Sequence, residues 1–235
     1  MSMRITYLPV LLLLFALAGC ATLPEGSPRN GAATPGKPER PAEKATSIQK
    51  RIVDAAMSFV GQNPDKLYVG DREFLCDCTG VVLASYYKAG IDLTPAFARE
   101  QGNGVARLHG VAERYDLSFG GRIPQAGDII FWDNTYDRDG DGAWGDPLTH
   151  AGIVVHVHPD GQIEYVHHNY RQGVVVAYMN LNDPETYQVQ KGDEILTVNS
   201  AMRMKSHRYI KPEEWLSSHL FRSFGRLSEL PASAR

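Results

Sequence analysis

The sequence has little cysteine, little net charge and no apolar run of membrane-spanning length. Three cysteines in 235 residues are too few for a small domain held together by disulfides. A formal net charge of −3, with no basic stripe, argues against nucleic acid as a partner. The apolar run at residues 8–17 is shorter than the roughly 20 residues that a membrane-spanning helix needs. With 43% hydrophobic residues, the chain can still bury one substantial core.

The first residues have the pattern of a secretory signal. A positively charged start with Arg4 precedes the apolar run, which ends in LAGC at Cys20. The motif resembles a bacterial lipoprotein signal, which implies that residues 1–19 are removed and that Cys20 carries the lipid. Because Ala21 rather than an aspartate follows, the resemblance favours the outer membrane, with the protein facing the periplasm. The membrane is therefore an expected partner, through the anchor.

The segment after Cys20 does not have the composition of a folded element. Residues 20–45 are rich in Pro, Gly, Ala and charge, and contain too little apolar surface to offset the cost of ordering. We predict a flexible, lipid-anchored linker here and one folded domain at residues 46–235. Within that domain, residues 182–235 have the least clear pattern, although HLFRSFGRL favours a last strand.

The periodicity changes from helical to extended along the domain. A helix is predicted from a cap at Ser47, a second at residues 78–89, and two short ones within 94–116. The intervening residues 63–77 are rich in turn formers and are interpreted as irregular. Short β-rich runs follow at 127–133, 151–158, 161–168 and 173–179. Helices first and an antiparallel sheet afterwards predict an α+β domain.

Two cysteines, Cys76 and Cys78, flank Asp77 just where a helical pattern begins. Residues two apart seldom reach disulfide geometry without strain, so we expect at least one working thiol. Cys78 lies at the predicted helix N-terminus, where unsatisfied N–H groups lower a thiol pKa and favour the nucleophilic thiolate. Cys76 lies before the helix and is interpreted as structural.

A cysteine nucleophile needs a base, ideally a histidine oriented by a third polar group. His150 begins one predicted hairpin strand, and His167, His168 and Asn169 end the next. A three-residue loop in HPDGQ would put His168 on the face of His150, whereas a two-residue loop would put His167 there. One bulge reverses either result, so the pattern alone leaves the choice open.

Four motifs occur in a family-specific order: DCTG at 77–80, GDIIFW at 127–132, THAGIVV at 149–155 and YVHH at 165–168. This set resembles the NlpC family of papain-like cell-wall cysteine peptidases and the related CHAP amidohydrolase/peptidases. The resemblance implies a papain-like α+β fold, with the catalytic cysteine at a helix N-terminus packed on an antiparallel sheet.

The resemblance also implies roles for individual residues. Cys78 matches the nucleophile, His150 the base and His167 the third, orienting residue. The reserve candidates for the third role are the next two residues, His168 and Asn169.

Two further residues match positions near the active site of this family. Asp77 precedes the nucleophile, and Tyr68 in LYVG resembles an active-site tyrosine. Tyr68 departs from the family pattern because it lies one residue closer to the following glycine than is usual.

The activity implied by the resemblance is cleavage of amide bonds in peptidoglycan stem peptides through a thioester acyl-enzyme, with no cofactor required for the chemistry. The bond between D-glutamate and the diamino acid is expected, and the N-acetylmuramoyl–L-alanine amide is the enzymatic variant. We expect a monomer.

Two other classes of function compete with this hydrolase. One is a non-enzymatic, calcium-binding envelope lipoprotein that binds cell wall or a partner protein. The other is a thiol redox module using Cys76 and Cys78, against which the absence of C-x-x-C spacing argues.

An acidic insertion, TYDRDGDGAWGDPL, lies between FWDN and THAG. It reproduces the D-x-D-x-D-G half of an EF-hand calcium loop with Asp137, Asp139 and Asp141. Leu148 stands where the bidentate glutamate belongs, so Asp146 or Asp133 would have to substitute. Because the loop leads directly into His150, we expect a structural rather than a catalytic Ca²⁺ here.

Overall fold

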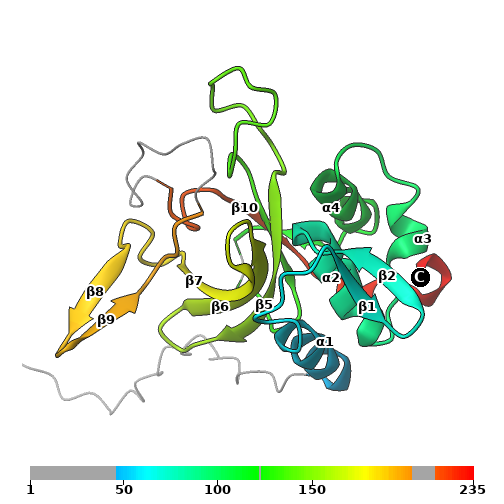
Figure 1. Ribbon diagram of the computed structural model, residues 1–235, viewed down its shortest axis with the longest axis horizontal. Helices are drawn as coiled ribbons and strands as arrows, with labels where there is room; N and C mark the ends of the chain where they lie inside the picture. Colours follow the sequence, from blue (N-terminus) through cyan, green and yellow to red (C-terminus); the bar gives the residue numbers. More distant parts are fainter. Residues whose placement is uncertain (1–45, 122, 203–214) are drawn as a thin grey trace, which may run out of the picture. The chain divides into compact units, whose positions relative to one another are not determined.

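The computed structural model describes residues 46–121, 123–202 and 215–235 (Figure 1). The predicted signal, the linker and Cys20 lie outside the described residues. The described chain is mixed α+β, with helices α1 to α4 followed largely by antiparallel strands. None of its helices in these ranges combines the length and the apolar character that crossing a membrane requires.

The helices confirm the helical periodicity of the sequence. They are α1 (Ser47–Met57), α2 (Cys78–Lys88), α3 (Thr94–Phe97) and α4 (Gly104–Arg114). The predicted cap of α1 was wrong by one residue. Thr46, not Ser47, caps α1, because the Thr46 hydroxyl accepts from the Gln49 N–H while the Gln49 side chain accepts from the Thr46 N–H.

The central sheet contains all four predicted β-rich runs and the predicted last strand. In sheet order, the strands are β3 (Ser118–Phe119), β10 (Phe221–Gly225), β4 (Ile129–Trp132), β5 (His150–Val157), β6 (Gln162–Asn169) and β7 (Gly173–Asn180). Every neighbouring pair is antiparallel. The strand β10, close to the C-terminus, pairs with both β3 and β4 and therefore lies inside the sheet rather than at its edge.

Two hairpins lie where the sequence gave no clear strand pattern. They are β1 (Lys66–Val69) with β2 (Arg72–Leu75), and β8 (Gln188–Lys191) with β9 (Glu194–Thr197). The interpretation of residues 63–77 as irregular was therefore wrong. These strands are short, and only Leu67 and Phe74 in them are buried, so alternation is too weak to recognise.

The sheet is buried on both faces. One face packs on the helices through residues such as Phe131, Ile153 and Val166. The other face, with Trp132 and Tyr165, packs on the C-terminal part of the chain. Figure 1 shows the helices on one side of the sheet and the β8–β9 hairpin on the other.

Strand β5 contains one bulge, which sets the register of its hairpin with β6. The connecting loop has three residues, because the His158 N–H donates to the Gln162 carbonyl at 2.8 Å. Val154 faces Tyr165 but His156 faces Glu164, so Val155 is the extra residue.

The loop and the bulge together decide whether His167 or His168 lies on the same face of the sheet as His150. A three-residue loop alone would place His168 on the face of His150. The bulge reverses the parity, so that His167 pairs with Gly152 and shares the face of His150.

Candidate active site

The N-terminus of α2 explains the DCTG motif. Cys78 is the first residue of α2, and the Asp77 carboxylate caps the helix by accepting from the Gly80 N–H at 2.7 Å. A side chain at Gly80 would place its Cβ 1.8 Å from the Leu75 carbonyl oxygen. Only glycine therefore lets β2 approach the helix end so closely, and this approach fixes the position of Cys78.

The Cys78 thiol faces the start of β5. Its sulfur lies within hydrogen-bonding reach of the backbone N–H groups of Ala151 and Thr79. Ala151 directly follows His150, so packing of α2 against β5 brings the thiol to the residue beside the predicted base.

His150 and His167 form a hydrogen-bonded pair. His150 Nε2 lies 2.8 Å from His167 Nδ1, and the two rings meet edge to face. His167 is only 6% exposed, so the contact is fixed by packing. With the proton of His150 on Nε2, its Nδ1 is left as the basic nitrogen. The third residue predicted from the family resemblance thus lies where it can orient the imidazole.

Burial controls the protonation of these groups. It lowers the pKa of His150 well below its ordinary value, with His167 and His168 adding to the effect. Burial likewise lowers the pKa of His167 to about 3. Burial, followed by the Asp77 charge, raises the pKa of the Cys78 thiol to about 11, against the smaller effect of the N–H groups that face the sulfur.

The expected lowering of the thiol pKa by the helix N-terminus was therefore wrong. The resting site combines a neutral thiol with a neutral imidazole, and the sulfur must lose its proton during the attack.

The two reserve residues have other neighbours. His168 lies near Asp77, whose charge opposes the lowering of the His168 pKa by burial. The Asn169 side chain accepts from the N–H groups of Arg171 and Gln172, and so shapes the turn into β7. Neither contact orients His150.

The other two residues singled out in the sequence lie at the edge of this arrangement. Tyr68 is on β1, 67% exposed, and pairs across the hairpin with Glu73. Cys76 is a half-buried free thiol that packs against the core, and Cys78 is free as well.

Sequence reasoning missed two neighbours of the catalytic candidates, both in the acidic insertion. Thr135 lines a shallow pocket together with His150, His167 and His168. Tyr136 lies close enough to Cys78 that a charge on the sulfur raises the tyrosine pKa, second to burial. Their distance from Cys78 in the sequence gave no signal, because the loop brings them close to α2 only in the folded chain.

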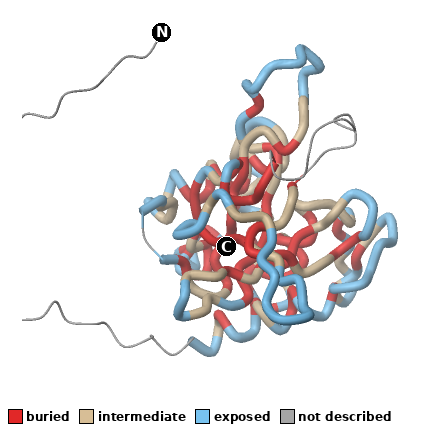
Figure 2. The backbone as a smooth tube through the Cα atoms, turned by 90° about the vertical axis from the view of Figure 1, so that its left-hand side faces the viewer, coloured by how far each residue is buried: buried red, intermediate tan, exposed pale blue. Residues whose placement is uncertain are grey.

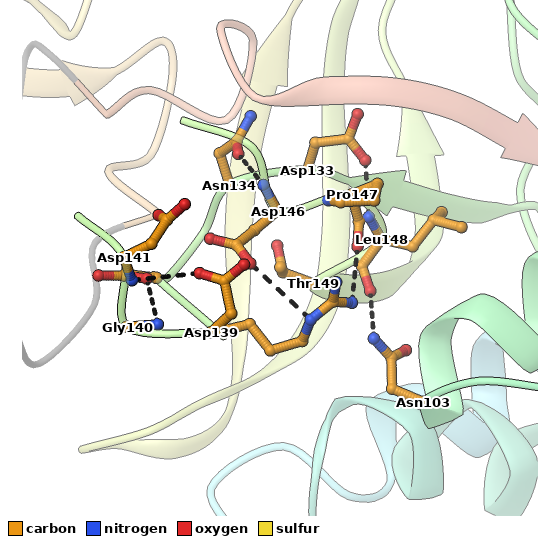
Figure 3. Close-up of polar contacts among 12 residues, drawn as sticks. Asn103, Asp133, Asn134, Asp139, Gly140, Asp141, Asp146, Pro147, Leu148 and Thr149 are labelled. Carbon is orange, nitrogen blue, oxygen red and sulfur yellow. Dashed lines mark hydrogen bonds and ion pairs between the residues drawn. The ribbon is translucent and has the colours of Figure 1, made fainter. Parts of the chain in front are cut away.

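The acidic insertion brings together a different set of carboxylates from the one predicted. Asp137 and Asp139 group with Asp146, and Asp141 lies outside the group. Figure 3 shows Asp139, Asp141 and Asp146 of this loop. Asp133, the other suggested substitute, pairs with Arg222.

The comparisons with known proteins agree with this geometry. Residues 68–169 match the CHAP domain. The CHAP match runs from β1 to the end of β6 and includes Cys78, His150 and His167. It implies peptidoglycan hydrolysis by an amidase or peptidase activity. No curated protein and no solved structure matched the chain.

Proposed function

We propose that the chain is a cysteine hydrolase that cleaves amide bonds in peptidoglycan stem peptides. The observation that carries the proposal is the His150–His167 hydrogen bond, together with a Cys78 thiol that faces the backbone of Ala151, the residue after His150, inside the segment that matches the CHAP domain. A half-buried cysteine at a capped helix N-terminus, on a helix that packs against an antiparallel sheet, also supports a papain-like arrangement.

The chemistry begins with the neutral pair. As the Cys78 sulfur attacks the amide carbonyl carbon, its proton passes to Nδ1 of His150. His150 then gives this proton to the leaving nitrogen as the C–N bond breaks, which leaves a thioester on Cys78. Water, deprotonated by His150, attacks the thioester and releases the new carboxyl group and the thiol. His167 keeps the imidazole oriented throughout.

The start of α2 provides donors for the oxyanion. Asp77 already binds the Gly80 N–H through its side chain and the Val81 N–H through its carbonyl. The N–H groups of Cys78 and Thr79 precede these and sit at the helix end, where the helix dipole also favours negative charge.

The bond we propose is the one between D-glutamate and the diamino acid, with the N-acetylmuramoyl–L-alanine amide as the enzymatic variant. The LAGC motif supports a lipid anchor at Cys20, and Ala21 supports the outer membrane as its location, facing the periplasm.

Digestion of crosslinked peptidoglycan by the purified full chain tests the proposal. The fragments are identified by mass spectrometry for the wild type, Cys78→Ala and Cys76→Ala. We expect new fragments from the wild type and from Cys76→Ala, with masses that identify the bond, and none from Cys78→Ala.

Each contrary result has a definite meaning. Retained activity in Cys78→Ala would refute the assigned nucleophile. Loss of activity in Cys76→Ala, with the fold intact, would favour the redox interpretation. Wall binding without cleavage by all three proteins would favour a binding module.

A further inference from the structure

The loop between β4 and β5 carries a group of carboxylates outside the catalytic pair. It projects from the sheet, and Figure 2 shows most of its length as exposed. One oxygen from each of Asp137, Asp139 and Asp146 lies within 4.8 Å of the other two. Two oxygens that bind one Ca²⁺ at about 2.4 Å can be at most about 4.8 Å apart, and each pair in this group meets that limit.

Asp146 distinguishes this group from an ordinary acidic turn on the surface, because its carboxylate is buried. It is only 2% exposed, and its buried Oδ1 has no hydrogen-bond partner. A buried carboxylate oxygen without a partner is costly. Asp137 and Asp146 also line one pocket, together with Tyr136, Trp144 and Trp215. Asp146, with its unpartnered oxygen, therefore lines the same pocket as Asp137, a second candidate ligand.

Arg138 is the nearest cation to this oxygen, and its contact is weak. Its Nε lies 3.8 Å from Asp146 Oδ1, beyond hydrogen-bond distance, while its guanidinium donates to the Pro147 carbonyl at 3.2 Å (Figure 3). Among the described residues, only the partly exposed guanidinium of Arg138 forms an ion pair with one of the four aspartates between positions 137 and 146. Within that part of the chain the carboxylates outnumber the paired cation, which favours a divalent ion.

The backbone holds Asp146 in place without using its carboxylate. The Asp146 N–H donates to the Asn134 side chain, and the Asp146 carbonyl accepts from the Asn134 N–H, each at 2.8 Å. Close by, the Thr149 hydroxyl accepts from the Thr135 N–H at 2.9 Å. The base of the loop is therefore already formed, and the carboxylate is free for a ligand.

We propose that Asp137, Asp139 and Asp146 bind one Ca²⁺, and that the ion fixes the acidic loop onto the strand ends that carry His150. The donor set consists of hard oxygens on a glycine-containing loop, which suits the flexible coordination of Ca²⁺ better than the strict octahedron of Mg²⁺. The guanidinium of Arg138 competes with the ion for Asp146. Neither the binding nor its test depends on the hydrolase function.

Titration calorimetry of the purified full chain with CaCl₂, and separately with MgCl₂, tests the site. We expect one Ca²⁺ per chain with a Kd on the order of 10⁻⁴ M, and binding of Mg²⁺ at least about tenfold weaker. Asp137→Asn and Asp139→Asn should each weaken Ca²⁺ binding at least tenfold. Asp139 is exposed, so Asp139→Asn should keep the wild-type circular dichroism and unfolding midpoint. Asp137 also accepts from the Gly140 and Gly142 N–H groups, so the unfolding midpoint of Asp137→Asn is measured beside its Ca²⁺ affinity.

Two further variants sharpen the ligand assignment. Asp141→Asn is the matched control, because Asp141 lies in the same loop but outside the group, and it should change the Kd less than about threefold. Arg138→Gln should tighten binding, because it removes the competing cation. Terbium luminescence excited through tryptophan provides a second readout, and Trp144→Phe should dim it because Trp144 lines the same pocket as Asp137 and Asp146.

The proposal has clear contrary outcomes. Absence of saturable binding up to about 10 mM Ca²⁺ would overturn the site. Equal affinity for Mg²⁺ would overturn the choice of ion. A loss in Asp141→Asn as large as that in Asp139→Asn would overturn the exclusion of Asp141 from the ligand set.

Discussion

Acid should destabilise this fold through His167, and the size of the effect follows from its burial. The folded protein keeps His167 neutral, with a pKa of about 3, whereas the unfolded chain protonates it near its ordinary value of 6.5. Because the pKa of this histidine is lower in the folded protein than in the unfolded chain, the stability it contributes is fully present above the unfolded pKa. That stability is lost as the pH falls below it. The loss is about 1.4 kcal/mol per pH unit below 6.5, so about 2 kcal/mol by pH 5.

Urea unfolding of the wild type and of His167→Asn at pH 7, 6 and 5, followed by circular dichroism, measures this effect. We expect the free energy of unfolding to fall less steeply with pH in the variant, by up to about 2 kcal/mol over this range. Other buried histidines act in the same direction but are common to both proteins. Identical pH dependence in the two proteins would show that His167 is not held neutral by burial, and would refute this account of its pKa.

Four further predictions concern the same site. Because the pKa of His150 lies well below 6.5, kcat/KM on peptidoglycan fragments should stay constant as pH falls from 7 to 6.5; a drop centred near 6.5 would contradict the assigned environment. His167→Ala should lower kcat by about 10³-fold, and His168→Ala by less than about threefold, in a steady-state assay; the reverse order would make His168 the third residue. Alkylation of Cys78 by iodoacetamide, resolved by peptide mass spectrometry, should accelerate up to about pH 11, and a plateau near neutral pH would indicate a preformed thiolate. Gly80→Ala should destabilise the fold by about 3 kcal/mol or more in urea, because its Cβ would meet a backbone carbonyl that cannot move alone; a wild-type midpoint would refute that account.

The local sequence pattern was sufficient to predict the helices and strands that are long or strongly periodic. The helix from Cys78 and the hairpin strands of β5 and β6 lie where periodicity and turn residues place them. The family resemblance selected His167 correctly as the residue that contacts His150, but local physics did not. The choice depends on one bulge at Val155, and nothing in the run GIVVHV marks which residue is extra.

The remaining features depend on contacts between distant segments. The pKa of Cys78 depends on burial beneath β5 and on the Asp77 charge, and a helix N-terminus in the sequence reveals neither the depth nor the neighbours. The grouping of Asp139 with Asp146 likewise arises because the loop folds back through Asn134. A motif of alternating aspartates points to the segment but not to the residue that completes it.

The bulge in β5 also affects how relatives of this protein can be compared. An alignment that moves one gap across Val155 exchanges His167 and His168 as the equivalent of the third residue, although each strand still matches by itself. In YVHH both choices place histidine against histidine, so the alignment score cannot detect the exchange. For chains with a single histidine at this point, the third residue should be assigned by counting strand pairs outward from Gly152↔His167, on the catalytic side of the bulge.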